Sequence, residues 1–264
     1  MKAIMSDTQK FLNVALAAMK KAEPVFRKSF GKPLTIGTKG HPRDWVTNID
    51  KEIEQIFIAE IKKNFPEHEI VGEEFSATLV PKGKYVWYLD PIDGTTQYIH
   101  GIPFCCISAA LVDEKGPLIG VISNPETGEL FHAIRGGGAF KNGKKISVST
   151  TNKLTTSLGG IGWTDTEGPE KLFANLVPLL GKIRVFASSA LQLCLVGDGR
   201  LDSYVVTGIS AWDVAAGILI AAEAGGKVSD FKGSASALSS PDRLLVTNGK
   251  IHAQFLEAIR KSGM

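Results

Sequence analysis

The chain has 264 residues, of which 44% are hydrophobic and 22% are charged, and its formal net charge is +3. These proportions are ordinary for a soluble globular protein, and the length allows one large domain or two modest domains with a substantial core. The small charge gives no support for a nucleic-acid partner. No stretch approaches the roughly 20 apolar residues of a membrane-spanning helix, and the N-terminus shows no signal-peptide pattern, so no membrane association is predicted.

The first half of the chain predicts two helices followed by a series of strands. Apolar residues recur at helical spacing in two segments, and Gly31 with Pro33 ends the first of them. Short apolar runs bounded by turn residues then predict strands, and Asn142-Gly143 is a strong signal for a two-residue hairpin. The predicted elements are helices over about 8–30 and 47–64 and strands over 70–71, 85–89, 105–112, 117–123 and 130–135.

In the second half, helices and strands alternate. The polar stretch 147–156 is the best position for a domain boundary, which divides the chain into an N-terminal α+β domain, 1–150, and a C-terminal α/β domain, 151–264. Strands with intervening helices indicate a layered α/β architecture. The predicted elements are helices over 170–180, 190–196, 212–224 and 250–260 and strands over 184–186, 202–206, 228 and 244–247.

Three cysteines, Cys105, Cys106 and Cys194, all lie in apolar runs. Their odd number and their setting favour reduced, buried thiols in a cytoplasmic protein over a disulfide framework. Neighbouring side chains on a strand point to opposite faces, and this disfavours a shared metal or redox role for Cys105 and Cys106.

The segment Asp90-Pro91-Ile92-Asp93-Gly94-Thr95 carries the clearest chemical signal in the chain. It follows the strand at 85–89 and places two carboxylates, three positions apart across a Pro-Ile turn, before a glycine and a hydroxyl. Oxygen ligands of this kind select Mg²⁺, and the two Asp residues could share one cation or bridge two. The N–H groups of Gly94, Thr95 and Thr96, at a predicted helix start, could bind a phosphate.

Three further acidic residues at the ends of predicted elements support this interpretation. Glu73 follows a strand, Asp213 lies in the first turn of a helix, and Asp50 lies near the start of another helix. Taken alone, Asp90 and Asp93 could be turn and N-cap residues, but the whole set favours a metal site. The motifs of P-loop, serine-hydrolase, zinc-protease and dinucleotide sites are absent, and the five histidines show no paired spacing.

Two segments are similar to the two signatures of the inositol monophosphatase family of Mg²⁺-dependent, lithium-sensitive phosphatases: Asp90 to Thr95, and Trp212-Asp213-Val214-Ala215-Ala216-Gly217. With supporting motifs in the family's order, the resemblance covers nearly the whole chain, from about residue 10 to 260. It implies an αβαβα-layered sandwich of the inositol monophosphatase and fructose-1,6-bisphosphatase type. It also implies a phosphomonoesterase acting on a small phosphorylated polyol or sugar, and a homodimer, because many relatives are dimers.

The resemblance implies two or three Mg²⁺ ions per site. One would be bound by Glu73, Asp90 and the backbone carbonyl of Ile92. A second would lie between Asp90, Asp93 and Asp213. A third, weaker ion would reach Glu73 through water.

The implied catalytic residues are Glu73, Thr95 and Asp50. Thr95, oriented by Asp50, would help to position and deprotonate the attacking water, so that no covalent phosphoenzyme is required. The N–H groups of Gly94 and Thr95 would hold the phosphate. The implied substrate contacts are Asp93, Gly94, Thr95, Ser189 and Asp213.

Two departures from the family pattern bear on the substrate. Gln97 stands where the family usually has Asn, and it is expected to keep a structural hydrogen bond. Val206 stands where many inositol-specific members have a Glu that binds substrate hydroxyls, which leaves Ser189 as the expected hydroxyl contact. Inositol 1-phosphate is the leading substrate, with fructose 1,6-bisphosphate, histidinol phosphate and adenosine 3′,5′-bisphosphate as alternatives. A catalytically silent binding protein of the same fold is the less favoured hypothesis, since none of the metal carboxylates is lost.

Overall fold

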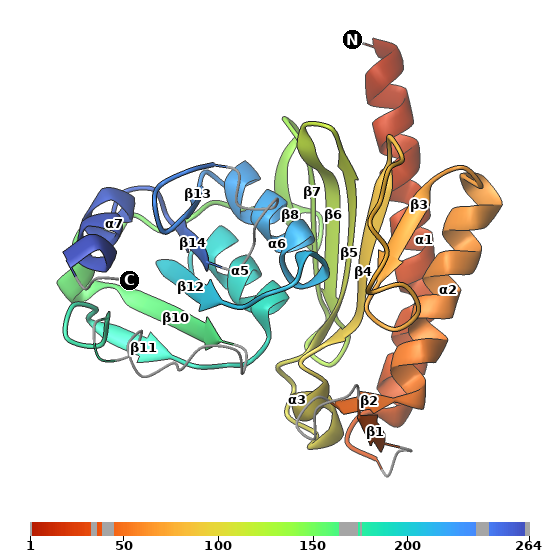
Figure 1. Cartoon of the computed structure of the whole chain (residues 1–264), viewed down its shortest axis with the longest axis horizontal. Helices are drawn as coiled ribbons and strands as arrows, with labels where there is room; N and C mark the ends of the chain where they lie inside the picture. The colour runs from red at the N-terminus through yellow and green to blue at the C-terminus, as the bar shows by residue number, and fades with distance from the viewer. Residues whose placement is uncertain are drawn as a thin grey trace.

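The structure is a computed structural model of the chain that describes residues 2–32, 36–38, 45–163, 174, 176–235 and 243–261. Its elements form five layers, in which helices and sheets alternate (Figure 1). The outer helices are α1 (Lys2–Ser29) and α2 (Asn48–Asn64), the central helices are α5 (Ser189–Gly197) and α6 (Ala211–Glu223), and α7 (His252–Lys261) lies on the far face. This arrangement confirms the predicted αβαβα sandwich.

The seven-stranded sheet has the order β3-β4-β5-β6-β7-β8-β9, with β3 and β4 parallel and the other neighbours antiparallel. Its strands are β3 (Glu69–Gly72), β4 (Val86–Asp93), β5 (Cys106–Asp113), β6 (Gly116–Asn124), β7 (Glu129–Ile134), β8 (Gly138–Lys141) and β9 (Lys144–Lys145). Because side chains alternate along a strand, one face packs on α1 and α2 and the other on α5 and α6. Cys105 and Cys106 enter these two separate cores, and all three cysteines are free and buried, as predicted.

The five-stranded sheet has the order β11-β10-β12-β14-β13. Its strands are β10 (Leu158–Trp163), β11 (Lys182–Arg184), β12 (Ser203–Thr207), β13 (Lys227–Asp230) and β14 (Arg243–Thr247). Strand β10 was not predicted, because its glycines give it no strand propensity. A Cβ at Gly160 would lie 2.5 Å from Gln192 Oε1, and one at Gly162 would lie 2.3 Å from the Tyr204 hydroxyl. Close packing of neighbouring side chains therefore selects glycine in this strand.

The remaining elements are short or lie at the limits of the described chain. They are β1 (Ile36–Thr38), β2 (Trp45–Thr47), α3 (Thr95–Ile99) and a 3₁₀ turn (Leu154–Thr156). The β1–β2 pair was not predicted, since three residues carry too little periodicity. The prediction of β11 was two residues late. Of the predicted helix 170–180, residues 170–173 and 175 lie outside the described residues, 174 and 176 are helical, and 177–180 form a turn, so the helix was predicted too long at its C-terminal end. The domain limits at 150 and 151 stay a prediction.

None of the helices in the described ranges combines the length and the apolar character that crossing a membrane requires.

Candidate active site

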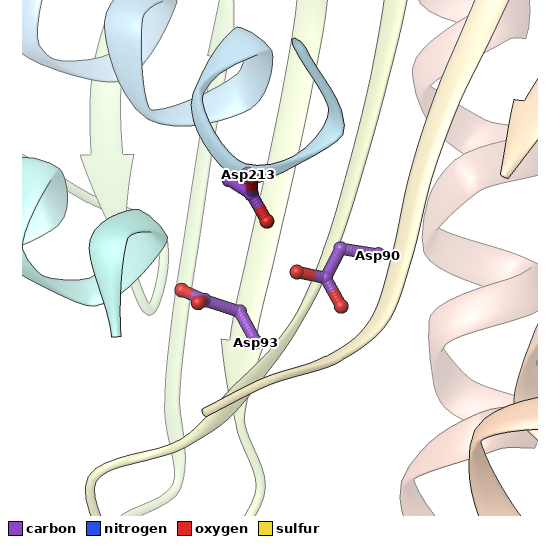
Figure 2. Close-up of side chains that lie close together, drawn as sticks. All are labelled: Asp90, Asp93 and Asp213. Carbon is purple, nitrogen blue, oxygen red and sulfur yellow. The ribbon is translucent and has the colours of Figure 1, made fainter. Parts of the chain in front are cut away.

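Three carboxylates from two elements meet between the seven-stranded sheet and helix α6. Asp90 and Asp93 extend from β4, and Asp213 extends from the first turn of α6 (Figure 2). One oxygen from each residue lies within 4.8 Å of the others. The structure therefore brings together the three Asp residues that the sequence singled out.

A one-residue bulge in β4 places Asp90 and Asp93 on the same face of the sheet. Asp90 pairs with Ser108 and Asp93 with Cys106, so three steps along β4 match two steps along β5. In a regular strand, residues three apart point to opposite faces, and the extra residue corrects this. The predicted Pro-Ile turn is thus wrong, because the backbone stays in β4 through Asp93. Pro91 suits a bulge, where a missing N–H costs no regular ladder bond.

The cluster gathers carboxylates at a largely buried position. Asp90 is 2% exposed and Asp93 is 7% exposed. Burial, followed by the charge of Glu73, raises the pKa of Asp90 and of Asp213 well above the ordinary value. Burial also raises the pKa of Asp93 to about 6, despite hydrogen bonds that lower it.

No ion pair between residues of the described ranges involves Asp90, Asp93 or Asp213. Buried carboxylates without a cationic partner are costly. The oxygen-only donor set therefore fits a hard divalent cation, which would supply the missing positive charge.

Glu73 lies at the edge of the cluster, directly after β3. Its charge is among those that raise the pKa of Asp90, and its N–H donates to the carbonyl of Leu89 at 3.2 Å. The turn that presents it is organised by the fully buried Glu54 of α2, which accepts the N–H groups of Glu74 at 2.8 Å and Phe75 at 3.1 Å. Glu54 was missed by the sequence analysis, although an acidic residue one turn after Asp50 on an apolar helix face was a readable signal.

Thr95 begins the short helix α3 and lies beside Asp50. Its hydroxyl is 3.0 Å from the carbonyl oxygen of Ile92 and 3.5 Å from Asp50 Oδ1. The other Asp50 oxygen accepts the N–H and hydroxyl of Thr47 in the capping box of α2. Asp50 is therefore fixed by its cap while one oxygen remains directed to Thr95. Gly94 has φ of 92°, a conformation that favours glycine.

Residues at the start of α5 connect the cluster to the five-stranded sheet. Ser188 Oγ donates to Asp93 at 2.7 Å, and the Ser189 hydroxyl is hydrogen-bonded to the Tyr204 hydroxyl at 2.8 Å. Val206, two residues after Tyr204 on β12, is buried in an apolar core. The sequence analysis missed Ser188 and Tyr204, since no local pattern shows which distant residues they meet.

Gln97 of α3 bridges to the segment before α5. Its Nε2 donates to the carbonyl of Phe186 at 3.2 Å, and the Phe186 ring stacks on Phe104 with centroids 4.4 Å apart. The amide thus holds the chain that leads into Ser188, and this is the structural hydrogen bond expected of Gln97.

Ala187, directly before Ser188, has φ of 55°, which is unfavourable for any residue with a Cβ. We expect Ala187→Gly to increase the free energy of unfolding by about 0.5–1 kcal/mol, because relief of the left-handed strain exceeds the added entropy of the unfolded chain. Urea denaturation measures the change.

Asn142→Gly is the matched control, because Asn142 also has positive φ, at 48°. Its side chain, however, accepts from Leu130 N and donates to the Gly128 carbonyl. Its replacement should therefore give no gain in stability. Equal stabilisation by the two variants would contradict the assignment of strain to Ala187.

Comparisons with known proteins agree on one family. The model of the inositol monophosphatase family matches residues 7–264. Inositol monophosphatase 1 of Solanum lycopersicum is 38% identical over 264 residues, covering 96% of this chain and 96% of the relative. Inositol-1-monophosphatase of Synechocystis is 39% identical over 261 residues, covering 96% and 90%. The solved structure of an IMPase from Thermotoga maritima has a TM-score of 0.88 at 33% identity, covering 96% of this chain and 98% of that chain.

The fold is that of solved inositol monophosphatases, and the acidic cluster that it brings together could hold a metal ion, as a metal-dependent phosphatase requires. The chain belongs to the inositol monophosphatase family. It is therefore a phosphatase that hydrolyses phosphate monoesters.

Proposed function

We propose that the protein is a Mg²⁺-dependent phosphatase of a small phosphorylated polyol or sugar, with inositol 1-phosphate as the leading substrate. The observation that carries this proposal is the cluster of Asp90, Asp93 and Asp213, largely buried and without an ion-pair partner within the described residues, beside Glu73. Carboxylate oxygens alone favour Mg²⁺ over softer metals. A solved relative described as an IMPase/NADP phosphatase, 26% identical with a TM-score of 0.85, was complexed with Ca²⁺, also a hard cation.

Glu73, Asp90, Asp93, Asp213 and the carbonyl of Ile92 are the proposed metal ligands. Bound Mg²⁺ would lower the pKa of water and neutralise charge on the phosphoryl oxygens. The Ile92 carbonyl accepts the Thr95 hydroxyl at 3.0 Å and keeps a second lone pair for a cation.

Thr95 and Asp50 form the proposed proton path from the attacking water. The Thr95 hydroxyl can accept from that water while its own hydrogen is directed to Asp50 or to the Ile92 carbonyl. The N–H groups of Gly94 and Thr95 would hold a phosphate oxygen. Asp93, Asp213 and Ser189 complete the proposed substrate contacts.

The proposed recognition of the alcohol part of the substrate depends on the second sheet. The Ser189 and Tyr204 hydroxyls form a buried pair that could exchange hydrogen bonds with a polyol, whereas Val206 offers none. Because Val206 cannot bind substrate hydroxyls, this position does not select inositol, and fructose 1,6-bisphosphate is the second candidate. A Thermotoga maritima relative named fructose-1,6-bisphosphatase/inositol-1-monophosphatase is 34% identical over 252 residues.

We also propose a cytoplasmic homodimer. The three free, buried cysteines suit a reducing compartment. Sedimentation velocity of the purified chain measures the oligomeric state, and a monomer at micromolar concentration would contradict the dimer.

Phosphate release from a substrate panel tests the proposed function. The panel contains inositol 1-phosphate, fructose 1,6-bisphosphate, histidinol phosphate and adenosine 3′,5′-bisphosphate, each with Mg²⁺ and with excess EDTA, compared by kcat/KM. We expect hydrolysis only with Mg²⁺, and the highest kcat/KM for inositol 1-phosphate. Thermal protection by Mg²⁺ without hydrolysis of any ester would instead indicate a silent binding protein.

A further inference from the structure

Asp93 lies on β4, yet helix α5 supplies most of its hydrogen-bond donors. Its Oδ2 accepts the Ser188 hydroxyl at 2.7 Å and the Ala190 N–H at 2.6 Å, and its Oδ1 accepts the Ser189 N–H at 3.2 Å. The Cys106 thiol approaches Oδ2 at 3.8 Å and Ser188 Oγ at 3.9 Å. Asp93 thus occupies the N-terminus of a helix that belongs to the other half of the chain.

This set of donors leaves the two oxygens of Asp93 in different states. A carboxylate oxygen has two lone-pair directions, and both on Oδ2 are used by Ser188 and Ala190. Among the described residues, Oδ1 accepts one backbone N–H, which leaves its other lone-pair direction open. The start of α5 therefore fixes the rotation of the carboxyl group and reserves Oδ1 for a cation.

The orientation of the Asp93 carboxylate depends on the side chain of Ser188. It is fully buried and is the N-cap of α5, accepting the Leu191 N–H at 3.4 Å while it donates to Asp93. The Ser188 hydroxyl thus caps the N-terminus of α5 and also binds the Asp93 carboxylate. The backbone donors of Ser189 and Ala190 are in turn positioned by the same cap.

We propose that Ser188 is a positioning residue for Asp93, and that divalent-cation binding is thereby coupled to the docking of α5 against β4. The inference rests on the proposed function, in which Asp93 is a metal ligand. Groups that orient a metal ligand typically change metal affinity or activity about 10-fold to 100-fold when removed.

Mn²⁺ titration followed by electron paramagnetic resonance tests the proposal on the intact protein without substrate. We expect Ser188→Ala to weaken Mn²⁺ binding about 10-fold to 100-fold and Ser188→Thr, which retains the hydroxyl, to bind within about 3-fold of the parent protein. Cys106→Ala should give a smaller loss, because an S–H donor is weak. The Mg²⁺ concentration for half-maximal phosphate release should rise in Ser188→Ala while kcat at saturating Mg²⁺ changes less.

Ser203→Ala is the matched control. Ser203 is also a fully buried serine of the same half, but its hydroxyl has no hydrogen-bond partner within the described part of the chain, so Mn²⁺ affinity should not change. If loss of the cap prevents Ser188→Ala from folding, Ser188→Gly removes the same hydroxyl at a smaller capping cost.

The possible results distinguish a failure of the Ser188 inference from a failure of the proposed function. Mn²⁺ affinity within 2-fold of the parent in both Ser188→Ala and Ser188→Gly, with only a lowered Tm, would show a purely structural cap and overturn the inference. Absence of saturable Mn²⁺ binding by the parent protein would overturn the proposed function itself.

Discussion

Asp90→Asn is expected to lower kcat/KM by about 100-fold to 10,000-fold while it raises the Tm measured in EDTA. Asp90 lies beside three other carboxylates, and burial, followed by their charges, raises its pKa. The amide removes this like-charge repulsion, so the protein without metal becomes more stable. It also removes a metal ligand, so activity and thermal protection by Mg²⁺ are lost together. Phosphate release and thermal unfolding with and without Mg²⁺ measure both effects.

Asp113→Asn, on the neighbouring strand β5, is the control, and we expect it to change stability in the opposite direction. The Asp113 carboxylate binds the Arg135 guanidinium through two hydrogen bonds, and these lower its pKa. Its replacement should reduce stability slightly and leave the Mg²⁺ response intact. Activity of Asp90→Asn within 3-fold of the parent protein would show that the acidic cluster has no catalytic role.

Gly120→Ala is expected to decrease the free energy of unfolding by about 3 kcal/mol. Gly120 lies on β6 beneath α6, and a Cβ there would be 2.8 Å from the carbonyl oxygen and 2.9 Å from the Cα of Ala216. Backbone atoms cannot rotate away, so the whole helix would have to move. Because α6 carries Asp213 one turn earlier, activity should fall as well. Chemical denaturation and phosphate release measure the two changes.

Gly37→Ala is the matched control for this steric argument. Gly37 also lies on a strand, and the nearest atom to its added Cβ would be a Val46 methyl at an ordinary 3.4 Å. Its stability should change by less than about 0.5 kcal/mol. Similar losses in Gly37→Ala and Gly120→Ala would indicate a general effect of strand glycines rather than a contact with α6.

Local patterns were sufficient to predict most of the fold. The helices at 48–64 and 211–223 follow from apolar spacing with capping residues at their starts, and the hairpin of β5 and β6 follows from two apolar runs around a polar turn. Strand β10 was missed because its glycines are selected by the side chains of Tyr204 and Gln192, which are distant in sequence.

The residues of the candidate site are likewise of two kinds: some have a local sequence signal, and others are identified only by contacts with residues distant in sequence. Asp90, Asp93 and Asp213 were predicted because each lies in a segment with a local sequence signal. Ser188, which binds Asp93, and Glu54, which organises the turn that presents Glu73, were both missed. A buried serine has no distinguishing sequence context, whereas the position of Glu54 on an apolar helix face was a signal that the prediction did not use. Their roles depend on hydrogen bonds to residues 95 and 20 positions away.

The bulge in β4 means that the length of this strand matters as much as its composition. Ile92 packs in the core beneath α1 and α2, while Asp93 faces α5. If β4 kept all its residues but paired regularly with β5 beyond Asp90, these two directions would be exchanged. A carboxylate would then enter an apolar core and an isoleucine would face the acidic cluster. The native register therefore depends on the bulge, which absorbs the extra residue, and a chain that paired regularly here should fail to fold.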